Sequence, residues 1–160
     1  MRPRKYPLEP LVRLKKERVE STTRQLGKAV LARESAERRH EEAASAQRQG
    51  DARASRVRTE ERDLLEKGEL SAADLIRANA WEVRVQTEGA ERAHAVDAAQ
   101  ATMATQRRRE LDAQAEVARS RGEAKAVDRH EARWIAAREK VREAEEEEAT
   151  SEAARPKPLR

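Results

Sequence analysis

The residues of this chain that could carry out chemistry are few and scattered. The histidines are His40, His94 and His130, and none has a second histidine four residues away. A helical zinc site usually needs such a pair, as in the HExxH pattern. His94 could share a metal ion with Asp97. His130 could share one with Glu131, although a solvated surface histidine is the simpler interpretation of both, so we expect no metal site.

Other catalytic patterns are missing from the sequence. The five glycines stand far apart, so no glycine-rich loop could cradle a phosphate. The chain has no cysteine, which excludes a disulfide framework and a cysteine-based metal site. No serine stands in a recognisable arrangement with histidine and aspartate. We therefore predict a protein that is not an enzyme and that has no catalytic residues and no cofactor.

Charge gives little sign of a nucleic-acid partner. The chain has 35 basic and 31 acidic residues, a net charge of +4, and the two signs alternate. A nucleic-acid-binding helix pair would carry a basic stripe, and a salt-dependent gel shift would reveal it. The run Glu145 to Glu148 could bind cations, but such runs are more often solubilising or docking segments.

The composition predicts long helices. Hydrophobic residues make up 37% of 160 positions, but 31 of them are alanine and none is phenylalanine, too few bulky side chains for a globular core. The common residues are good helix formers, and no proline interrupts residues 11–155. No apolar run approaches the 18 or so residues of a membrane span, and the N-terminus lacks the apolar stretch of a signal peptide. We expect a soluble, cytoplasmic protein.

A first helix is expected from about 8 to 67, after an irregular basic leader at 1–7. Pro7 and Pro10 suit its entry, because proline is tolerated in a first helical turn. Two rows of mostly apolar or small residues then repeat every seven positions, as in a coiled coil. The first row is Leu8, Lys15, Thr22, Ala29, Ala36, Ala43, Gly50, Val57 and Leu64, and the second contains Val12, Val19 and Leu26.

The stretch LLEKGELSAADLI at 64–76 predicts a tight turn at about 68–71. Lys67 suits a last helical turn, where a cation offsets the helix dipole. Gly68 can adopt the left-handed conformation that closes a helix. Ser71 and Asp74 form the S-x-x-D pattern that caps a new helix.

A second helix is expected from about 72 to 148, followed by a disordered tail at 149–160. Its seam positions alternate in steps of three and four residues, and most are apolar or small. They are Val96, Ala99, Met103, Gln106, Glu110, Ala113, Val117, Ser120, Ala124, Val127, Glu131, Trp134, Arg138 and Val141.

These patterns predict an all-α fold, a long antiparallel two-helix coiled-coil hairpin over residues 8–148. Each arm of roughly 60 residues would be about 90 Å long. Residues facing each other should have numbers that add up to about 139. The expected neighbours are Leu64 with Leu75, Val57 with Trp81 or Val83, Gly50 with Gly89, and Tyr6 and Leu8 with Trp134 and Ile135.

Six bulky apolar residues gather around the turn. One interpretation is that they only hold the turn together. The other is a tip that docks a partner, because one thin seam cannot bury so many bulky side chains and tryptophan is favoured at interfaces. The tip residues are Leu64, Leu65, Leu70, Leu75, Ile76 and Trp81.

Three stretches resemble the stalk proteins of type III secretion, the YscO class. KYPLEPLVRLKKERVE at 5–20 is similar to the opening of that family, with its Tyr-Pro-Leu and charged run. WEVRV at 81–85 is similar to the tryptophan-containing start of its second helix. ARWIAAREKVREAEEE at 132–147 resembles its alanine-rich, charged end. The family is related in architecture to the flagellar export protein FliJ and to the coiled-coil part of the rotary ATPase gamma subunit.

The resemblance implies a bacterial cytoplasmic stalk, peripheral to a membrane-embedded secretion apparatus. It would link the hexameric export ATPase to the cytoplasmic ring of the export gate, and members are also associated with export chaperones. The tip would face the gate or chaperones. Flagellar relatives often have more aromatics there, so this tip favours the injectisome branch. The open end would face the ATPase with Tyr6, Leu8, Leu11, Trp134, Ile135 and Val141.

The main alternative is a generic coiled-coil scaffold or adaptor that self-associates into a four-helix assembly. Leu14, Leu31 and Leu111 lie off the rows described above, which is compatible with a second, intermolecular seam. Light scattering at several concentrations would separate the two hypotheses.

Overall fold

A computed structural model of the chain describes residues 5–153. It contains two helices, α1 (Glu9–Glu66) and α2 (Ala72–Ala153), and no strand within the described residues. The fold is therefore all-α, with two long helices joined by a short turn. This agrees with the fold class that the composition and the heptad rows predict.

The end of α2 differs from the expected one. Residues 149–153 are helical, so the prediction of a disordered tail from residue 149 is wrong for these positions. The hydroxyl groups of Thr150 and Ser151 bond to the carbonyl oxygens of Glu147 and Glu148, which supports this last part of the helix. Residues 1–4 and 154–160, which include the rest of the expected leader and tail, lie outside the described residues.

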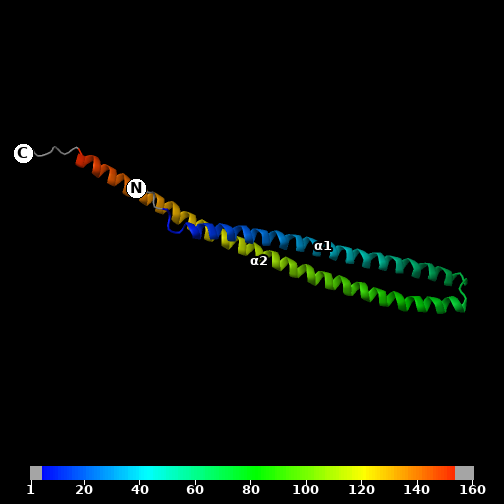
Figure 1. The fold of residues 1–160 in the computed structure, drawn as a ribbon. Coiled ribbons are helices and arrows are strands. Elements are labelled where there is room, and N and C mark those ends of the chain that lie inside the picture. Colours follow the sequence, from blue (N-terminus) through cyan, green and yellow to red (C-terminus); the bar gives the residue numbers. More distant parts are fainter. Residues whose placement is uncertain (1–4, 154–160) are drawn as a thin grey trace, which may run out of the picture. The chain divides into compact units, whose positions relative to one another are not determined.

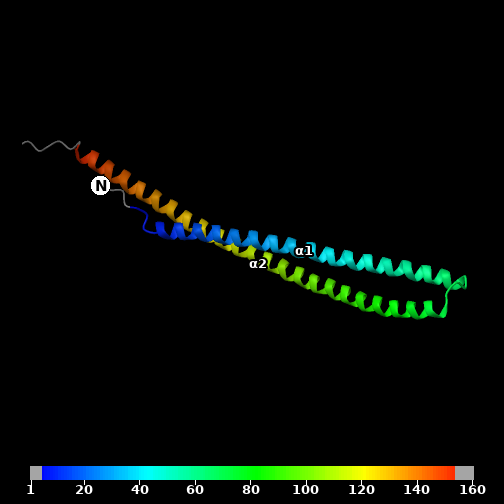
Figure 2. The same ribbon diagram turned by 45° about the vertical axis from the view of Figure 1, so that its right-hand side comes forward.

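Contacts divide the chain into two units, which we call unit 1 (Met1–Leu26 with Ala113–Arg160) and unit 2 (Gly27–Asp112). In each unit, a segment of α1 lies beside a segment of α2 and runs in the opposite direction (Figure 1), and a rotated view shows the same pairing (Figure 2). Unit 2 contains the turn between the helices. Unit 1 contains the start of α1 and the end of α2.

The seam of unit 1 follows the predicted rows. Val12 and Thr22 of α1 are buried, as are Val117 and Ser120 of α2. The Thr22 and Ser120 hydroxyl oxygens lie 2.9 Å apart and share a hydrogen bond. Each hydroxyl can also donate to a carbonyl three residues earlier on its own helix. The two polar groups in the seam are therefore satisfied despite their burial.

The seam of unit 2 is built mainly from small side chains. Ala36 and Ala54 are buried. The first predicted row of α1 and the predicted seam of α2 contribute further half-buried positions, and the small side chains among them allow the two backbones to approach closely. These positions are Ala29, Ala43, Gly50, Val57, Val96, Ala99 and Met103.

Pairs of residues across the seam agree with the predicted register. Lys15 contacts Glu123 at 2.7 Å, and their numbers add up to 138. In unit 2, Arg58 contacts Glu82 at 2.7 Å, and their numbers add up to 140. The periodicity of the rows and the position of the turn were therefore sufficient to predict which parts of the two helices face each other.

The predicted pairing of Gly50 with Gly89 stays a prediction, but the space in front of Gly50 is not empty. The space in front of Gly50 is filled by the guanidinium group of Arg92, and a Cβ atom at Gly50 would lie 2.5 Å from its Nε. At Gly89 an added Cβ would meet nothing within 4 Å. A long arginine side chain folded across the seam occupies the room that two facing glycines would have left empty.

Candidate functional site

The turn between the helices is closed by two standard capping motifs. Gly68 has a φ of 70° and donates to the carbonyl of Leu65 at 3.0 Å. The next N–H, of Glu69, donates to the carbonyl of Leu64 at 3.1 Å. These two hydrogen bonds form a Schellman motif, which satisfies carbonyls at the end of α1. The local sequence therefore fixes where the first helix stops.

Ser71 and Asp74 form the capping box that starts α2. The Ser71 backbone N–H donates to the Asp74 carboxylate at 2.9 Å, and the Asp74 N–H donates to the Ser71 hydroxyl at 3.2 Å. Hydrogen bonds from the Ser71 hydroxyl, the Ser71 N–H and Arg77 lower the pKa of Asp74 to about 2. Because these bonds favour the charged form, the cap is complete only when the carboxylate is ionised.

The structure exposes most of the tip residues. Ile76 is 72% exposed and Leu65 is 56% exposed, while Leu64 and Leu75 are also largely accessible. Leu70 and Trp81 are half-buried and line one hollow of about 300 Å³ together with Val57. Val57 and Trp81 thus share one hollow of unit 2, as the predicted pairing requires. The four leucine and isoleucine side chains outside the hollow form an apolar surface around the turn.

The open end, in unit 1, is organised by one buried aromatic side chain. Tyr6 is 7% exposed, and its ring packs edge-on against Trp134 with centroids 5.5 Å apart. Its hydroxyl is 2.5 Å from Nδ1 of His130. The guanidinium group of Arg138 lies over the Trp134 ring, 6.0 Å from its centroid. These contacts attach the segment before α1 to the side of α2.

Burial controls the electrostatics of this cluster. The pKa of Tyr6 is raised, first because burial disfavours the phenolate and second because Glu131 lies nearby. The interpretation of His130 as an isolated surface histidine was incomplete, since its ring both contacts and hydrogen bonds with Tyr6. The sequence signal was its position four residues before Trp134, on the same helix face.

The other predicted open-end residues are more exposed to solvent than Tyr6. Leu11 is half-buried, whereas Leu8, Ile135 and Val141 are exposed. Arg138 and Val141 were predicted as seam positions, but both are exposed. The reason is that Tyr6 already lies against Trp134, so no described residue of the N-terminal segment reaches further along α2.

Ion pairs connect the two helices in both units. Arg33 contacts Glu110 at 2.6 Å in unit 2, and Arg18 contacts Glu116 at 2.8 Å in unit 1. The Lys15 ammonium lowers the pKa of Glu123, first through a hydrogen bond and then through its charge. These mixed-charge edges explain the alternating signs in the sequence as a solvated surface with interhelical pairs.

Within residues 5–153, no group of three histidine, aspartate or glutamate side chains lies close enough to hold a metal ion. No helical stretch in the described part of the chain has the length and apolar character needed to cross a membrane. The hollow beside Trp81 is shallow and open to solvent.

Comparison with known proteins gives one match. The model of the YscO-like protein family matches residues 3–155, which is nearly the whole chain. Searches of curated proteins and of solved structures each give no match. The chain therefore belongs to the YscO-like family.

Membership places the chain among the structural proteins associated with type III secretion. The two-helix fold, the capped turn and the apolar residues at the tip and at the open end are therefore features of a secretion-associated protein.

Proposed function

We propose that this chain is the central stalk of a type III secretion system, with no enzymatic activity of its own. The open end faces the hexameric export ATPase, and the tip faces the cytoplasmic ring of the export gate or export chaperones. The protein acts in the cytoplasm of a bacterium, at the base of an injectisome. The observation that carries this proposal is the family match over nearly the whole chain.

The distribution of apolar side chains supports the two assigned surfaces. Ile76 and Leu65 at the tip and Ile135 at the open end are exposed, whereas the seam residues of both units are small or buried. Exposed apolar clusters surrounded by charged residues are typical of protein–protein contact sites. The tip and the open end are therefore suited to bind different partners.

The mechanism requires differential contacts and stiffness. A stalk held in a hexameric ring can couple nucleotide-driven states of the ring to a distant partner if its contacts differ between those states. The ionic edges and the small-residue seam keep the helices paired, as Lys15 with Glu123 and Arg58 with Glu82 illustrate. The proposed role therefore needs no catalytic group.

Variants of the open end provide the direct test of ATPase binding. Leu8→Ser with Ile135→Ser removes two exposed apolar side chains of the open end, while Leu65→Ser with Ile76→Ser removes two from the tip. We expect the first double variant to lose binding to the cognate export ATPase and the second to retain it. Equal binding by both variants, or no binding by the wild-type chain, would overturn the assignment of the open end.

The reciprocal experiment tests the tip. The isolated cytoplasmic domain of the export gate should bind the wild-type chain and the Leu8→Ser, Ile135→Ser variant equally well. The Leu65→Ser, Ile76→Ser variant should bind it at least about tenfold more weakly, because side chains at the centre of an interface usually dominate its affinity. Loss of gate binding by the open-end variant alone would reverse our orientation.

A second candidate function, a self-associating scaffold, is favoured by the exposure of three leucines off the seam. Leu31 is 66% exposed, Leu111 61% and Leu14 58%. A second copy packing on such side chains would produce a four-helix assembly. Light scattering that gives twice the mass of one chain, and the mass of a single chain for Leu31→Ser with Leu111→Ser, would support this function over a monomeric stalk.

A further inference from the structure

In unit 1, the last part of α2 has no described helix beside it. Tyr6 lies against Trp134 and α1 begins only after it, while α2 continues to Ala153. In Figure 1 this part of α2, drawn in orange and red, extends past the blue start of α1. Every side chain that the structure describes between residues 135 and 152 is exposed. We call residues 135–152 the helix extension.

The spacing of the seam continues through the helix extension, but its residue types change. Steps of four and three from Trp134 lead to Arg138, Val141, Glu145, Glu148 and Glu152. Because such steps keep residues on one side of a helix, the three glutamates follow the same face as the buried seam. Val141 on this face is 49% exposed. The seam face therefore passes from Trp134 and Val141 to a row of three carboxylates, which we call the glutamate row.

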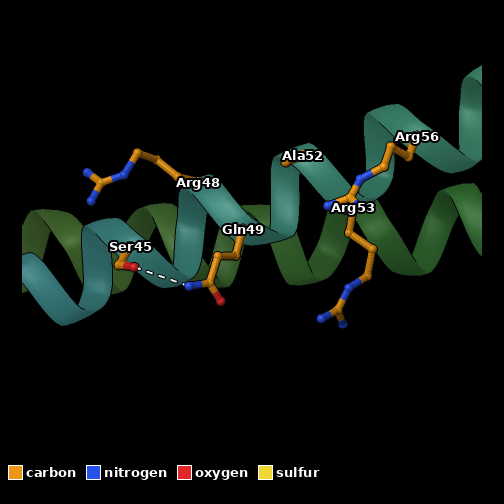
Figure 3. A pocket seen from close by; sticks show the side chains of 6 residues that line it. All are labelled: Ser45, Arg48, Gln49, Ala52, Arg53 and Arg56. Carbon is orange, nitrogen blue, oxygen red and sulfur yellow. Dashed lines mark hydrogen bonds between the residues drawn. The ribbon is translucent and has the colours of Figure 1, made fainter.

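The glutamate row differs from charged positions elsewhere on the surface. Around residues 45–56 of α1, Arg48 and Arg53 extend to opposite sides of the helix (Figure 3), and Arg48 is paired with Glu41 at 2.6 Å. The members of the glutamate row share one face. Among the described residues, the one ion pair of the helix extension joins Arg142 to Glu146 at 3.4 Å, so no described cation lies within ion-pair distance of the row.

The glutamate row stands where carboxylates are unfavourable in a helix. A helix C-terminus carries partial negative charge, so carboxylates near it raise the free energy of the helix. α2 ends at Ala153, one residue after Glu152. A cationic segment beside the row would offset this repulsion and stabilise the last turns of α2.

The sequence before α1 supplies such cations and an anchor for them. Arg2, Arg4 and Lys5 precede Tyr6. Arg2 and Arg4 lie outside the described residues, and Lys5 is exposed. Because Tyr6 is packed on Trp134 and α1 runs antiparallel to α2, the residues before Tyr6 start where the helix extension starts. Arg2 and Tyr6 each precede a proline, and this position favours an extended backbone.

The distance from Tyr6 to Arg2 matches the distance from Trp134 to the glutamate row. Four extended residues span about 13 Å. The helix rises about 16 Å from Trp134 to Glu145, and the long side chain of an arginine covers the difference. In an extended segment every second side chain points the same way, so Arg2 and Arg4 are expected on the same side as Tyr6, toward α2.

We propose that residues 1–5 lie along the helix extension, where Arg2 forms an ion pair with Glu145 or Glu148. The length of this segment, its opposite charge and the continuity of the glutamate row with the seam select it as the occupant. Arg138 shares the face, but its guanidinium group lies over the Trp134 ring. The chain thereby covers part of its own open end, and this inference does not depend on the stalk function.

The test uses the full-length chain with one spin label. The chain has no cysteine, so Ala144→Cys places a single nitroxide on an exposed position beside the glutamate row. Nuclear magnetic resonance then measures how strongly the label broadens the backbone amide signals of Arg2 and Arg4. We expect strong broadening at about 0.05 M salt, which weakens as salt is added because exposed ion pairs are screened. Broadening that is the same at low and high salt would overturn the proposal.

Matched charge variants locate the contact. Glu145→Lys with Glu148→Lys should lower the broadening at Arg2 roughly two- to fivefold, as expected for the loss of an exposed ion pair. Glu143→Lys with Glu147→Lys makes the same charge change on the opposite face of α2 and should lower it less than about 1.5-fold. Lysine is a good helix former, so both variants should keep their circular dichroism. Equal losses in the two variants would show general charge attraction and contradict the proposal.

A charge swap and a mixing experiment complete the test. Arg2→Glu with Arg4→Glu, combined with Glu145→Lys and Glu148→Lys, should restore the broadening, and failure to restore it would contradict a direct ion pair. A second copy of the chain is the alternative occupant. Isotope-labelled chain without the nitroxide, mixed with nitroxide-labelled chain without isotope, reports only contacts between molecules and should show no broadening at Arg2. Broadening as strong as in the singly mutated chain would assign the face to a second copy and overturn our proposal.

Discussion

The guanidinium group of Arg92 lies directly over Gly50, so that an added Cβ would be 2.5 Å from its Nε. That Nε atom is buried and has no hydrogen-bond partner within the described residues. The contact therefore leaves the Nε of Arg92 without a partner, although Nη1 of the same side chain forms an ion pair with Glu88 at 3.6 Å. A flexible side chain held by one long, partly exposed ion pair can move away at small cost.

Replacing Gly50 by alanine should consequently raise the melting temperature slightly. Alanine favours the helix over glycine by about 1 kcal/mol, and displacement of Arg92 offsets part of this gain. Gly122→Ala is the matched control, because its Cβ would meet nothing within 4 Å, and it should give the larger rise. Thermal unfolding followed by circular dichroism measures both, and a fall in melting temperature for Gly50→Ala would show that Arg92 is held firmly.

Gly68→Ala should have the opposite effect. The φ of 70° at this residue is a left-handed conformation, which costs alanine about 1–2 kcal/mol. No other contact in the turn offsets this cost. The measurement is the urea midpoint, with Gly122→Ala again as control. If Gly68→Ala unfolded at the same urea concentration as the wild-type chain, the Schellman motif would not contribute to stability.

The Asp74 cap should make stability depend on pH in the acid range. The folded-state pKa of about 2 lies below the ordinary value of 3.8, so the contribution is fully present above pH 3.8 and is lost as the pH falls toward 2. Asp74→Asn should remove this part of the dependence. Urea unfolding at pH 5, 3 and 2 should therefore show a difference between wild type and variant that shrinks with acid. A constant difference would mean that the carboxylate charge is unimportant.

Tyr6 offers a direct spectroscopic check, since it is the only tyrosine in the chain. Its raised pKa means that the neutral phenol is favoured in the folded state, and that this contribution to stability is lost as the pH rises through the raised value above 10.0. Phenolate absorbance should titrate at higher pH in the native chain than in denaturant. Identical titrations in both states would show that Tyr6 is exposed to solvent. Glu131→Gln should slightly lower the pKa of Tyr6 in the native chain.

The hydroxyl groups of Thr22 and Ser120 should be energetically coupled. Ser120→Ala removes one partner of a buried hydrogen bond and should cost about 1 kcal/mol, as should Thr22→Val. The double variant should lose less than the sum of the two, because the bond is removed only once. Equilibrium unfolding of all four proteins measures the coupling, and strict additivity would mean that the two hydroxyls act independently.

The sequence was sufficient to predict the repeating features of this fold. Heptad rows such as Val12 to Leu26, the glycine at 68 and the capping pair at 71 and 74 are local signals, and each corresponds to a seam or turn residue in the structure. The register followed from the position of the turn, because an antiparallel pair has only one free alignment once its turn is fixed.

Contacts that depend on side-chain reach could not be predicted in the same way. Periodicity places Gly50 at the seam but does not show that Arg92 extends across it. The bond between Tyr6 and His130 joins residues 124 positions apart and depends on the path of a non-helical segment. Exposure at the row ends, as at Leu64 and Val141, depends on where the opposite helix begins and ends.

The most direct test of the stalk proposal is the ATP turnover of the cognate export ATPase, measured with increasing amounts of the full-length chain. We predict a saturable increase in turnover that depends on hexamer formation. The Leu8→Ser, Ile135→Ser variant should not produce it, and the Leu65→Ser, Ile76→Ser variant should. Unchanged turnover at every concentration, together with no binding, would contradict the proposal and leave the self-associating scaffold as the better account.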